Sequence, residues 1–192
     1  MKFYQEIVLM PQPEISLYFL LSKEFQQIHL ALVENKIDDH SSAIGVSFPE
    51  YDASQFMLGS KLRLFAPEKV DLEKLQCEKW LSRLKDYLQC SEITPVPEVV
   101  TGYACFRQVK PKGNKEKLAR RRAKRHGESL EQALAFYDAY QEEHSPLPYI
   151  NMSSQSNGSH FRLFIEKQEK EKPQGGVFSC YGLSRTTTVP LF

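Results

Sequence analysis

The sequence predicts an α+β fold in two parts, and three patterns along its 192 residues support this prediction. Short stretches rich in β-branched and aromatic residues alternate with longer stretches in which apolar residues recur at helical spacing. Hydrophobic residues make up 41% of the chain, which is enough for a packed core. A dense basic run at 110–126 separates two patterned halves. We therefore expect one domain at 1–108 and a second at 109–192.

The first half predicts six elements. Residues 2–9 are rich in β-formers and end before Pro11 and Pro13, which predicts a strand. From Glu14 to about Lys36 the apolar residues follow a helical period, with Pro13 placed where helices tolerate it. The remaining predictions are strands at 43–48 and 61–66, a helix at 68–89 and an extended segment at 91–109.

This order, strand–helix–strand–strand–helix–strand, is the ferredoxin-like βαββαβ arrangement, which is also the fold of RNA-recognition motif domains. The aromatic motifs that such domains carry on their central strands are missing from the sequence. The face of this sheet is therefore not the predicted RNA platform.

The second half predicts a smaller α+β domain that begins with a basic helix. Asn114 can cap this helix and Gly127 can end it. An acidic amphipathic helix is predicted to follow at 128–143, and then strands at 149–153, 160–167 and 177–183.

Positive charge is concentrated between Lys110 and His126. This segment holds nine Lys or Arg residues and one acidic residue, whereas the whole chain carries a net charge of +1. Such a block repels itself unless a polyanion neutralises it, and the common polyanion is a nucleic-acid backbone. Only Leu118, Ala119 and Ala123 are apolar, too few for a buried stripe, so we expect this helix to dock on phosphates rather than on its own domain. The plainer alternative is a solvated helix face.

Other features exclude several classes of protein. The apolar stretches are too short and too broken by charge to span a membrane, and the first residues do not read as an export signal, so a cytoplasmic location is expected. The four cysteines form no C-x-x-C motif, and the five histidines complete no zinc pattern. We expect reduced cysteines, no metal and no cofactor.

Three places could carry chemistry. His29 lies in the first predicted helix; a lone histidine near an apolar face is more often a core or boundary residue, and the functional alternative is a general acid or base. Residues 153–164 could form an ordinary turn or a cluster of hydroxyls and amides that faces a phosphate or ribose. Tyr181 could pack in the core or hydrogen-bond to a catalytic group.

Several blocks, in this order, carry a resemblance to a known family: FQQIHLALV around His29, IGVSFPEYD at 44–52, LGSKLRLFAP at 58–67, NKEKLARRRAKRH at 114–126, SSQSNGSHFRLFIE at 153–166, FSCYGLS at 178–184 and the final VPLF. Together they resemble the type I-F CRISPR repeat-processing endoribonucleases, the Csy branch of the Cas-six superfamily. The likeness covers essentially the whole chain.

The resemblance implies an enzyme that binds a CRISPR repeat hairpin and cuts the precursor RNA at the 3′ base of the stem. Cleavage in this family needs no metal: the ribose 2′-hydroxyl attacks the adjacent phosphate and leaves a 2′,3′-cyclic phosphate. The family keeps its RNA product and joins other type I-F Cas subunits in a surveillance complex.

The resemblance also assigns roles to single residues. His29 would be the general base, Ser154 would position the 2′-hydroxyl and Tyr181 would orient the histidine. Phe161 would stack on the base pair that closes the stem. The further RNA-binding residues would be Gln155 and Ser156 near the cut, Arg120, Arg121, Lys124 and Arg125 in the major groove, and Lys112, Asn114 and Lys117 in support.

The linker before the basic helix departs from the family pattern. Many members have Arg-x-Gln there. Aligned without gaps from Asn114, this chain has Gln108 in place of the arginine and Lys110 in place of the glutamine, whereas a shift of one residue would restore Arg107. Arg107, Gln108 and Lys110 are therefore RNA-binding candidates whose base contacts stay open.

Two alternatives remain. A non-catalytic subunit could hold an RNA hairpin without cutting it. A DNA-binding regulator is less favoured, because no apolar-faced partner helix of a helix-turn-helix precedes the basic helix.

Overall fold

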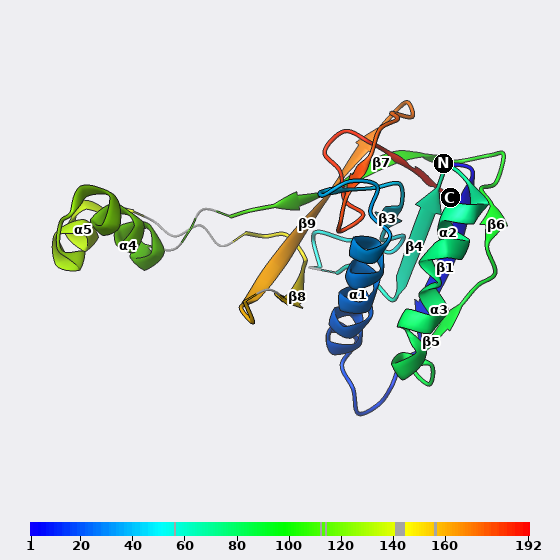
Figure 1. The fold of residues 1–192 in the computed structure, drawn as a ribbon, viewed down its shortest axis with the longest axis horizontal. Coiled ribbons are helices and arrows are strands. Elements are labelled where there is room, and N and C mark those ends of the chain that lie inside the picture. Colours follow the sequence, from blue (N-terminus) through cyan, green and yellow to red (C-terminus); the bar gives the residue numbers. More distant parts are fainter. Residues whose placement is uncertain (56, 112, 114, 141–144, 156) are drawn as a thin grey trace. The chain divides into compact units, whose positions relative to one another are not determined.

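The computed structural model describes residues 1–55, 57–111, 113, 115–140, 145–155 and 157–192. By their contacts, the residues divide into two units: Met1–Val109 together with Leu147–Phe192, and Lys110–Pro146 (Figure 1). The predicted α+β class is confirmed by the mixture of helices and antiparallel sheets. Within the described residues, every helix is too short or too polar to cross a bilayer.

The first sheet of the larger unit has the strand order β3-β4-β1-β5, and β6 also pairs with β1. All of its pairings are antiparallel, with Ile7 of β1 opposite Leu62 of β4. The predicted strands at 2–9, 43–48 and 61–66 are confirmed. The strands of this sheet are β1 (Phe3–Leu9), β3 (Gly45–Ser47), β4 (Lys61–Ala66), β5 (Leu88–Cys90) and β6 (Thr94–Pro95).

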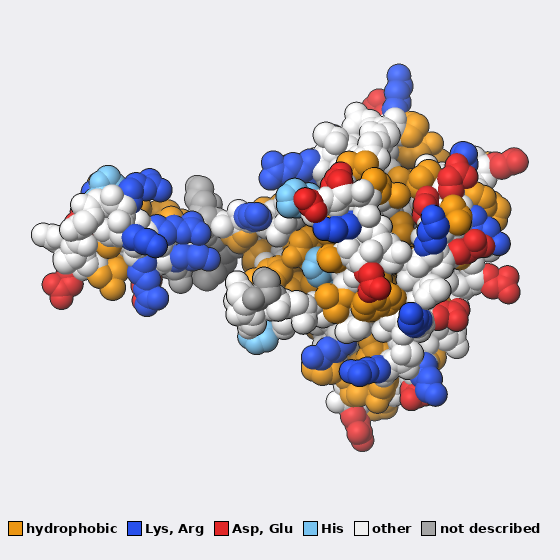
Figure 2. Space-filling model, in the orientation of Figure 1, with side chains coloured by type: hydrophobic (Ala, Val, Ile, Leu, Met, Phe, Trp, Pro, Cys, Tyr) orange, Lys and Arg blue, Asp and Glu red, His pale blue; other side chains and the backbone are white. Residues whose placement is uncertain are grey.

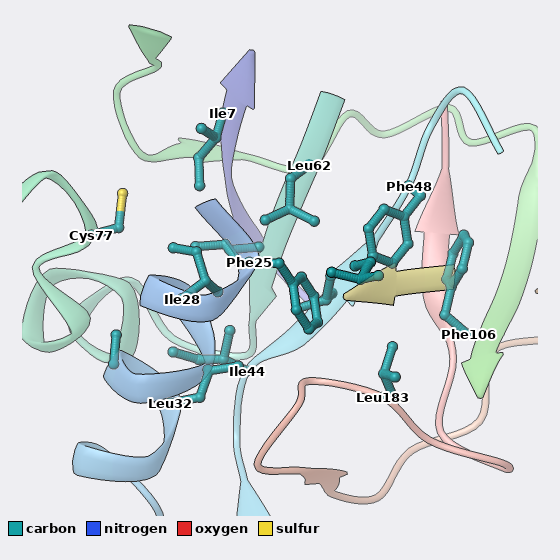
Figure 3. Packing of buried hydrophobic residues seen from close by; sticks show 14 of the residues in the cluster. Ile7, Phe25, Ile28, Leu32, Ile44, Phe48, Leu62, Cys77, Phe106 and Leu183 are labelled. Atoms are coloured by element: carbon teal, nitrogen blue, oxygen red, sulfur yellow. The ribbon is translucent and has the colours of Figure 1, made fainter. Parts of the chain in front are cut away.

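The first predicted helix is confirmed as α1 (Leu17–Glu34), and it covers one face of this sheet. Ser16 caps the helix, because its hydroxyl accepts the Phe19 N–H. Phe25, Ile28 and Leu32 of α1 are fully buried and point toward the sheet residues of the core (Figure 3). The helix is therefore held by its apolar stripe rather than by its ends.

The single helix predicted at 68–89 is wrong. Gln76 has φ +50°, a left-handed conformation that breaks the helix. The helical spacing of the apolar residues survives in the pieces, but Leu88 belongs to a strand and lies opposite Leu9. The pieces are α2 (Lys69–Leu75), α3 (Cys77–Trp80) and the 3₁₀ turn η1 (Ser82–Leu84).

The second sheet of the larger unit has the order β11-β7-β9-β8, again antiparallel. The strands predicted at 149–153 and 160–167 are confirmed, but the one predicted at 177–183 is only two residues long. A separate two-stranded sheet pairs β2 with β10. The strands are β2 (Ser41–Ser42), β7 (Gly102–Val109), β8 (Tyr149–Ser153), β9 (His160–Lys170), β10 (Phe178–Ser179) and β11 (Val189–Leu191).

Residues 178–183 form a turn, which we name the Tyr181 turn, that is fixed against β3. The Val46 N–H donates to the Gly182 carbonyl at 2.8 Å. Gly182 has φ +68°, and a β-carbon there would lie 2.3 Å from the Val46 side chain. A β-carbon on Gly45 would likewise lie 2.5 Å from the Phe178 ring. Only glycine permits this close approach at both positions.

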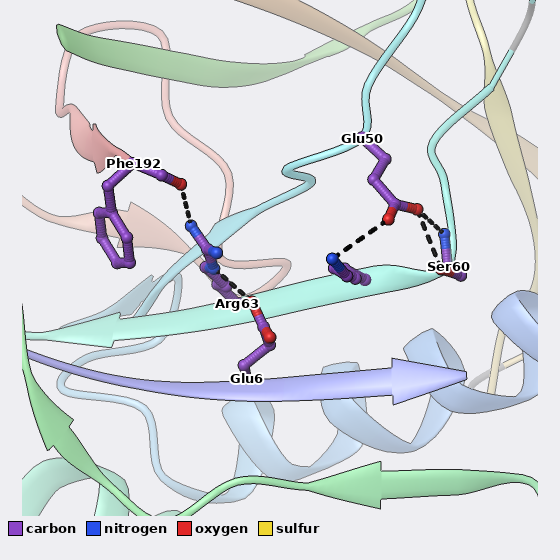
Figure 4. Close-up of polar contacts among 6 residues, drawn as sticks. Glu6, Glu50, Ser60, Arg63 and Phe192 are labelled. Carbon is purple, nitrogen blue, oxygen red and sulfur yellow. Dashed lines mark hydrogen bonds and ion pairs between the residues drawn. The ribbon is translucent and has the colours of Figure 1, made fainter. Parts of the chain in front are cut away.

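Polar contacts join the last residues of the chain to the first sheet. The Arg63 guanidinium lies 2.6 Å from the Glu6 carboxylate and donates to the Phe192 carbonyl at 2.6 Å (Figure 4). Nearby, the Glu50 carboxylate accepts the Ser60 N–H at 2.8 Å. The two contacts of Arg63 tie β4 to residues far away along the chain.

The smaller unit contains two helices, α4 (Lys115–His126) and α5 (Leu130–Phe136). The expectation that α4 lacks a partner in its own chain is wrong, because its small face packs on α5 with Ala119 and Ala133 fully buried. Gly127, with φ +68°, ends α4 as predicted. The second helix is shorter than the predicted 128–143; residues 141–144, like the predicted cap Asn114, lie outside the described part of the chain.

The contacts divide the chain differently from the expected boundary at 108/109. Val109, the last residue of β7, and Tyr149, the first residue of β8, both lie opposite Phe164 of β9. Because β8, β9 and β11 all join β7 in one sheet, residues 147–192 cluster with the N-terminal part. In the sequence, the smaller unit is thus an insertion between β7 and β8, which both pair with β9.

Glu24 on α1 is fully buried, and neither carboxylate oxygen has a hydrogen-bond partner among the described residues. Burial, with a smaller effect from nearby Cys90, raises its pKa well above the ordinary 4.5. The folded protein therefore keeps a proton that the unfolded chain loses above about pH 4.5, so the stability that Glu24 confers falls as pH rises.

Relative to Glu24→Gln, the free energy of unfolding of the natural protein should fall with rising pH above 4.5 by at most about 1.4 kcal/mol per pH unit. Urea unfolding between pH 5 and 8 measures this difference. Glu34→Gln, on an exposed residue of the same helix, is the matched control and should show no such trend. Parallel pH profiles for the natural protein and Glu24→Gln would contradict the assignment.

Candidate active site and nucleic-acid interface

His29 lies on the fourth turn of α1 and contacts the Tyr181 turn. Its Nδ1 is 2.9 Å from the carbonyl oxygen of Cys180. A carbonyl oxygen only accepts, so Nδ1 carries the proton and donates it. In the neutral imidazole the lone pair then resides on Nε2, which is the atom left to act as a base.

The ring of His29 is stacked on the ring of Tyr181, with centroids 4.1 Å apart and planes inclined by 6°. Burial lowers the pKa of His29 below 6.5, and the hydrogen bond to the Cys180 carbonyl offsets this in part. Burial also raises the pKa of the Tyr181 phenol, which keeps its proton. The pair therefore presents a neutral imidazole at pH 7, in the form that a general base requires.

Ser154 lies in the turn of the hairpin between β8 and β9. Its N–H donates to the Ser159 carbonyl at 2.8 Å, and its own carbonyl accepts the Gly158 N–H at 2.9 Å. This hairpin is tethered to the helix of His29, because Gln26 accepts the Ser153 N–H at 2.9 Å through its side-chain oxygen. Gln26 is one helical turn before His29, so a single helix positions both candidates.

Phe161 and Gln155 belong to the same hairpin. Phe161 lies opposite Met152 and is only partly buried at the end of the β9 face that carries the buried Leu163. Gln155 is exposed. Ser156, the third candidate of this hairpin, lies outside the described residues.

The Lys and Arg residues of the basic helix α4 fall into two groups: some contact other residues of the smaller unit, and others are exposed. Arg122 lies over the Phe136 ring at 3.7 Å and forms an ion pair with Glu128 at 2.6 Å that is not aligned as a hydrogen bond. Lys115 pairs with Asp138 at 2.9 Å. These two cations are therefore engaged in contacts inside the smaller unit.

The cations that are predicted from the sequence to bind RNA are other residues of α4. Arg120 is exposed and pairs with Glu116 one turn earlier. The smaller unit carries Lys and Arg side chains gathered over its surface, whereas acidic and basic side chains are interspersed on the larger unit (Figure 2). The exposed candidates are Lys117, Arg120, Arg121, Lys124 and Arg125; Lys112 and Asn114 lie outside the described residues.

The three linker candidates differ in their surroundings. Arg107 forms an ion pair with Glu166, its cross-strand neighbour. Gln108, the next residue of β7, points to the opposite face of the strand and is partly buried. Lys110 is exposed beyond the strand.

Two contributors to the site were missed from the sequence. Gln26 was not singled out, although its position one turn before His29 was a usable signal. The Cys180 carbonyl gives no signal in a sequence, because every residue has one. Among the described residues, no group of three His, Cys, Asp or Glu side chains could hold a metal ion.

The chain is similar to known proteins over its full length. Residues 4–192 match the family model described as CRISPR-associated protein (Cas_Csy4). A protein of Escherichia coli (strain UTI89 / UPEC) named CRISPR-associated endonuclease Cas6/Csy4 is 38% identical over 193 residues, covering 100% of both chains. One of the same name from Pseudomonas aeruginosa (strain UCBPP-PA14) is 39% identical, also covering 100% of both chains.

Among solved structures, a CRISPR associated protein Cas6 aligns with 100% of this chain and 99% of its own at 13% identity and a TM-score of 0.30, a likeness too slight to carry an argument. The match to the family model and the full-length identity to two relatives rest on the whole sequence. On these grounds, the chain belongs to the Cas6/Csy4 family of type I-F CRISPR-associated proteins.

Proposed function

We propose that this protein is an endoribonuclease that cuts CRISPR precursor RNA at the 3′ base of the repeat hairpin. Both relatives are named endonucleases. The observation that carries the proposal is the fixed tautomer of His29: Nδ1–H is held by the Cys180 carbonyl, so Nε2 is left as a base. The stacked Tyr181 ring supports this role because it holds the imidazole plane.

In the proposed reaction, Nε2 of His29 takes the proton of the ribose 2′-hydroxyl at the base of the stem. The 2′ oxygen attacks the adjacent phosphorus, and the bond from phosphorus to the 5′ oxygen of the next nucleotide breaks. The 5′ oxygen takes up a proton, so the products are a 2′,3′-cyclic phosphate and a 5′-hydroxyl. No metal takes part in this scheme.

Ser154 is proposed to hold the 2′-hydroxyl in line with the phosphate. The Gln26 tether supports this, because it fixes the Ser154 hairpin to the helix of His29. Phe161 would stack on the last base pair of the stem, with Gln155 and Ser156 beside the same phosphates. Alignment of the attacking and leaving oxygens would supply much of the remaining acceleration.

The basic helix is proposed to hold the hairpin. The major groove of long RNA duplexes is too narrow for side chains, but a short hairpin has open ends that long Arg and Lys side chains can reach. The exposure of Arg121 and Arg125 supports their assignment to phosphates and bases. Arg107, Gln108, Lys110, Lys112 and Asn114 would add contacts at the foot of the stem.

Two further parts of the proposal concern architecture and partners. The β3-β4-β1-β5 order with helices between the strands supports a ferredoxin-like arrangement of 1–108. We also propose that the protein keeps its cleaved RNA and joins other type I-F Cas subunits.

His29→Ala should lower the single-turnover cleavage rate of repeat RNA in EDTA by roughly 10²–10⁴-fold, because a general base contributes about that much. Gel analysis of end-labelled repeat RNA measures the rate. His40→Ala, an exposed histidine in a loop, is the control and should cut normally. Intact RNA with the natural protein would instead favour a non-catalytic hairpin-binding subunit, and unchanged cutting by His29→Ala would refute the mechanism.

The pH dependence of cleavage should report the lowered pKa of His29. A base works deprotonated, so kcat/KM should rise with pH on the acid side and reach a plateau. The midpoint of the rise should lie below pH 6.5. Tyr181→Ala uncovers the imidazole and should move that midpoint to higher pH, whereas Tyr181→Phe keeps the stacked ring and the midpoint. An NMR titration of His29 in the free protein checks the value independently, and a midpoint above 6.5 there would contradict the assignment.

Arg121→Ala combined with Arg125→Ala should flatten the salt dependence of hairpin binding. Each lost phosphate contact lowers the slope of log K against log salt by about 0.7–0.9, so the pair should lower it by about 1.4–1.8. Binding measured across a salt series gives the slope. Lys69→Ala combined with Lys74→Ala on α2 removes the same charge elsewhere and should leave the slope unchanged; equal slopes for both doubles would show that α4 is not the RNA-binding element.

A further inference from the structure

A cleft of about 650 Å³ lies between α1 and the β8–β9 hairpin. A second hollow of about 300 Å³ continues it and shares Tyr18, Ser22 and Asn151 with it. Both lie within the larger unit. Among the residues that line this cleft, the proposed function assigns an RNA contact only to Phe161, and it uses Gln26 as a tether.

Aromatic rings line the cleft and stand open to solvent. Tyr18 is 51% exposed and Phe19 is 53% exposed, both on the first turn of α1. Phe161 lies on the opposite wall and Tyr149 in the second hollow. Apart from Val33 at its other end, which is 38% exposed, α1 buries its other large apolar side chains fully or partly. Two adjacent uncovered aromatic rings at one end of the helix therefore indicate an interaction site.

Cations accompany these rings. The Lys23 ammonium is 5.1 Å from the centroid of Phe19, and the Arg162 guanidinium is 4.7 Å from that of Tyr149. Among the described residues that line the two hollows, none is an aspartate or a glutamate. Aromatic rings with cations and without carboxylates are the chemistry of single-stranded nucleic-acid sites.

The cleft also adjoins the candidate active site. Gln26 lines it one turn before His29, and Ser153 lines it next to Ser154. Because Phe161 is proposed to lie under the last base pair, the cleft begins where the stem ends. The RNA strand that continues on the 3′ side of the cut would therefore leave the active site past Gln26 and Ser153.

We propose that this cleft binds the first unpaired nucleotide on the 3′ side of the cut, with its base stacked on Phe19 and its phosphate near Lys23. This inference rests on the proposed function and specifies the substrate for it: a precursor RNA with a 3′ flank is bound better than the bare hairpin. Stacking uses the face of a base, so the site tolerates all four bases but not an abasic residue.

The test uses repeat hairpins made uncleavable by a 2′-deoxyribose before the cut. They carry a 3′ flank of zero, one or three nucleotides, an abasic first position, or a 5′ flank only. Kd is measured for the full-length natural protein and for two variants. These are Phe19→Ala and, as the matched control, Val33→Ala, which removes an exposed apolar side chain at the other end of α1.

A one-nucleotide 3′ flank should lower Kd for the natural protein about 5- to 150-fold, because stacking of one base has about that effect. The abasic flank and Phe19→Ala should each abolish this gain, and Val33→Ala should preserve it. All three proteins should bind the hairpin without a flank equally.

Three results would overturn the inference: no gain from the 3′ flank, a gain that Phe19→Ala leaves intact, or a gain from the 5′ flank that Phe19→Ala abolishes. A loss of affinity for the bare hairpin in Phe19→Ala would also overturn it. Failure of the proposed function looks different, because then the natural protein neither binds the bare hairpin nor cuts its ribose form.

Discussion

The seating of the Tyr181 turn on β3 is the contact on which the rest of the larger unit depends. It brings residues more than 130 positions apart in the sequence together through a backbone hydrogen bond between Val46 and Gly182 and two glycines that leave no room for a side chain. The same turn presents the Cys180 carbonyl and the Tyr181 ring to His29. The core and the candidate base His29 therefore depend on the same contact. A substitution that displaces the Tyr181 turn from β3 would free the His29 imidazole and also disrupt the packing of the core.

Charge and chemistry are divided between the two units. The smaller unit has almost no apolar core: Ala119 and Ala133 are buried, Arg122 lies over Phe136 of α5, and Lys115 pairs with Asp138 beyond the end of α5. The other Lys and Arg residues that the structure describes in this unit face solvent. The larger unit holds the histidine, whose pKa burial has lowered, against two uncharged groups, the Cys180 carbonyl and the Tyr181 ring. A general base next to a phosphate needs such surroundings, since a cluster of cations would lower its basicity further.

Local patterns in the sequence predicted the elements that depend on local physics. The strands at 3–9 and 61–66 and the helix at 17–34 follow from period and composition alone. The break at Gln76 could not be predicted, because glutamine is not a residue type that favours the left-handed conformation found there. The short strands β2 and β11 exist only through partners far along the chain. The fold class could therefore be predicted from the sequence, whereas the pairing of the strands that complete the sheets could not.

For the candidate site, the sequence supplied the side chains but not what holds them. His29 and Tyr181 are residue types that can be singled out from the sequence, and in the structure their rings are stacked. The carbonyl of Cys180 could not be selected. For the basic segment, the charge count identified the helix but not which cations are already committed to Asp138, Glu128 and Phe136.

The insertion of the smaller unit has an evolutionary consequence. The chain leaves β7 at Val109 and returns to β8 by Tyr149, and both residues lie opposite Phe164. Adjacent strands are about 4.8 Å apart, so the two junctions are held roughly 10 Å from each other by the sheet itself. A segment of any length whose ends meet at that spacing could be exchanged here without disturbing the sheet that carries the candidate site. Recombination at this one place would let a lineage change its charged helices while inheriting the larger unit unchanged.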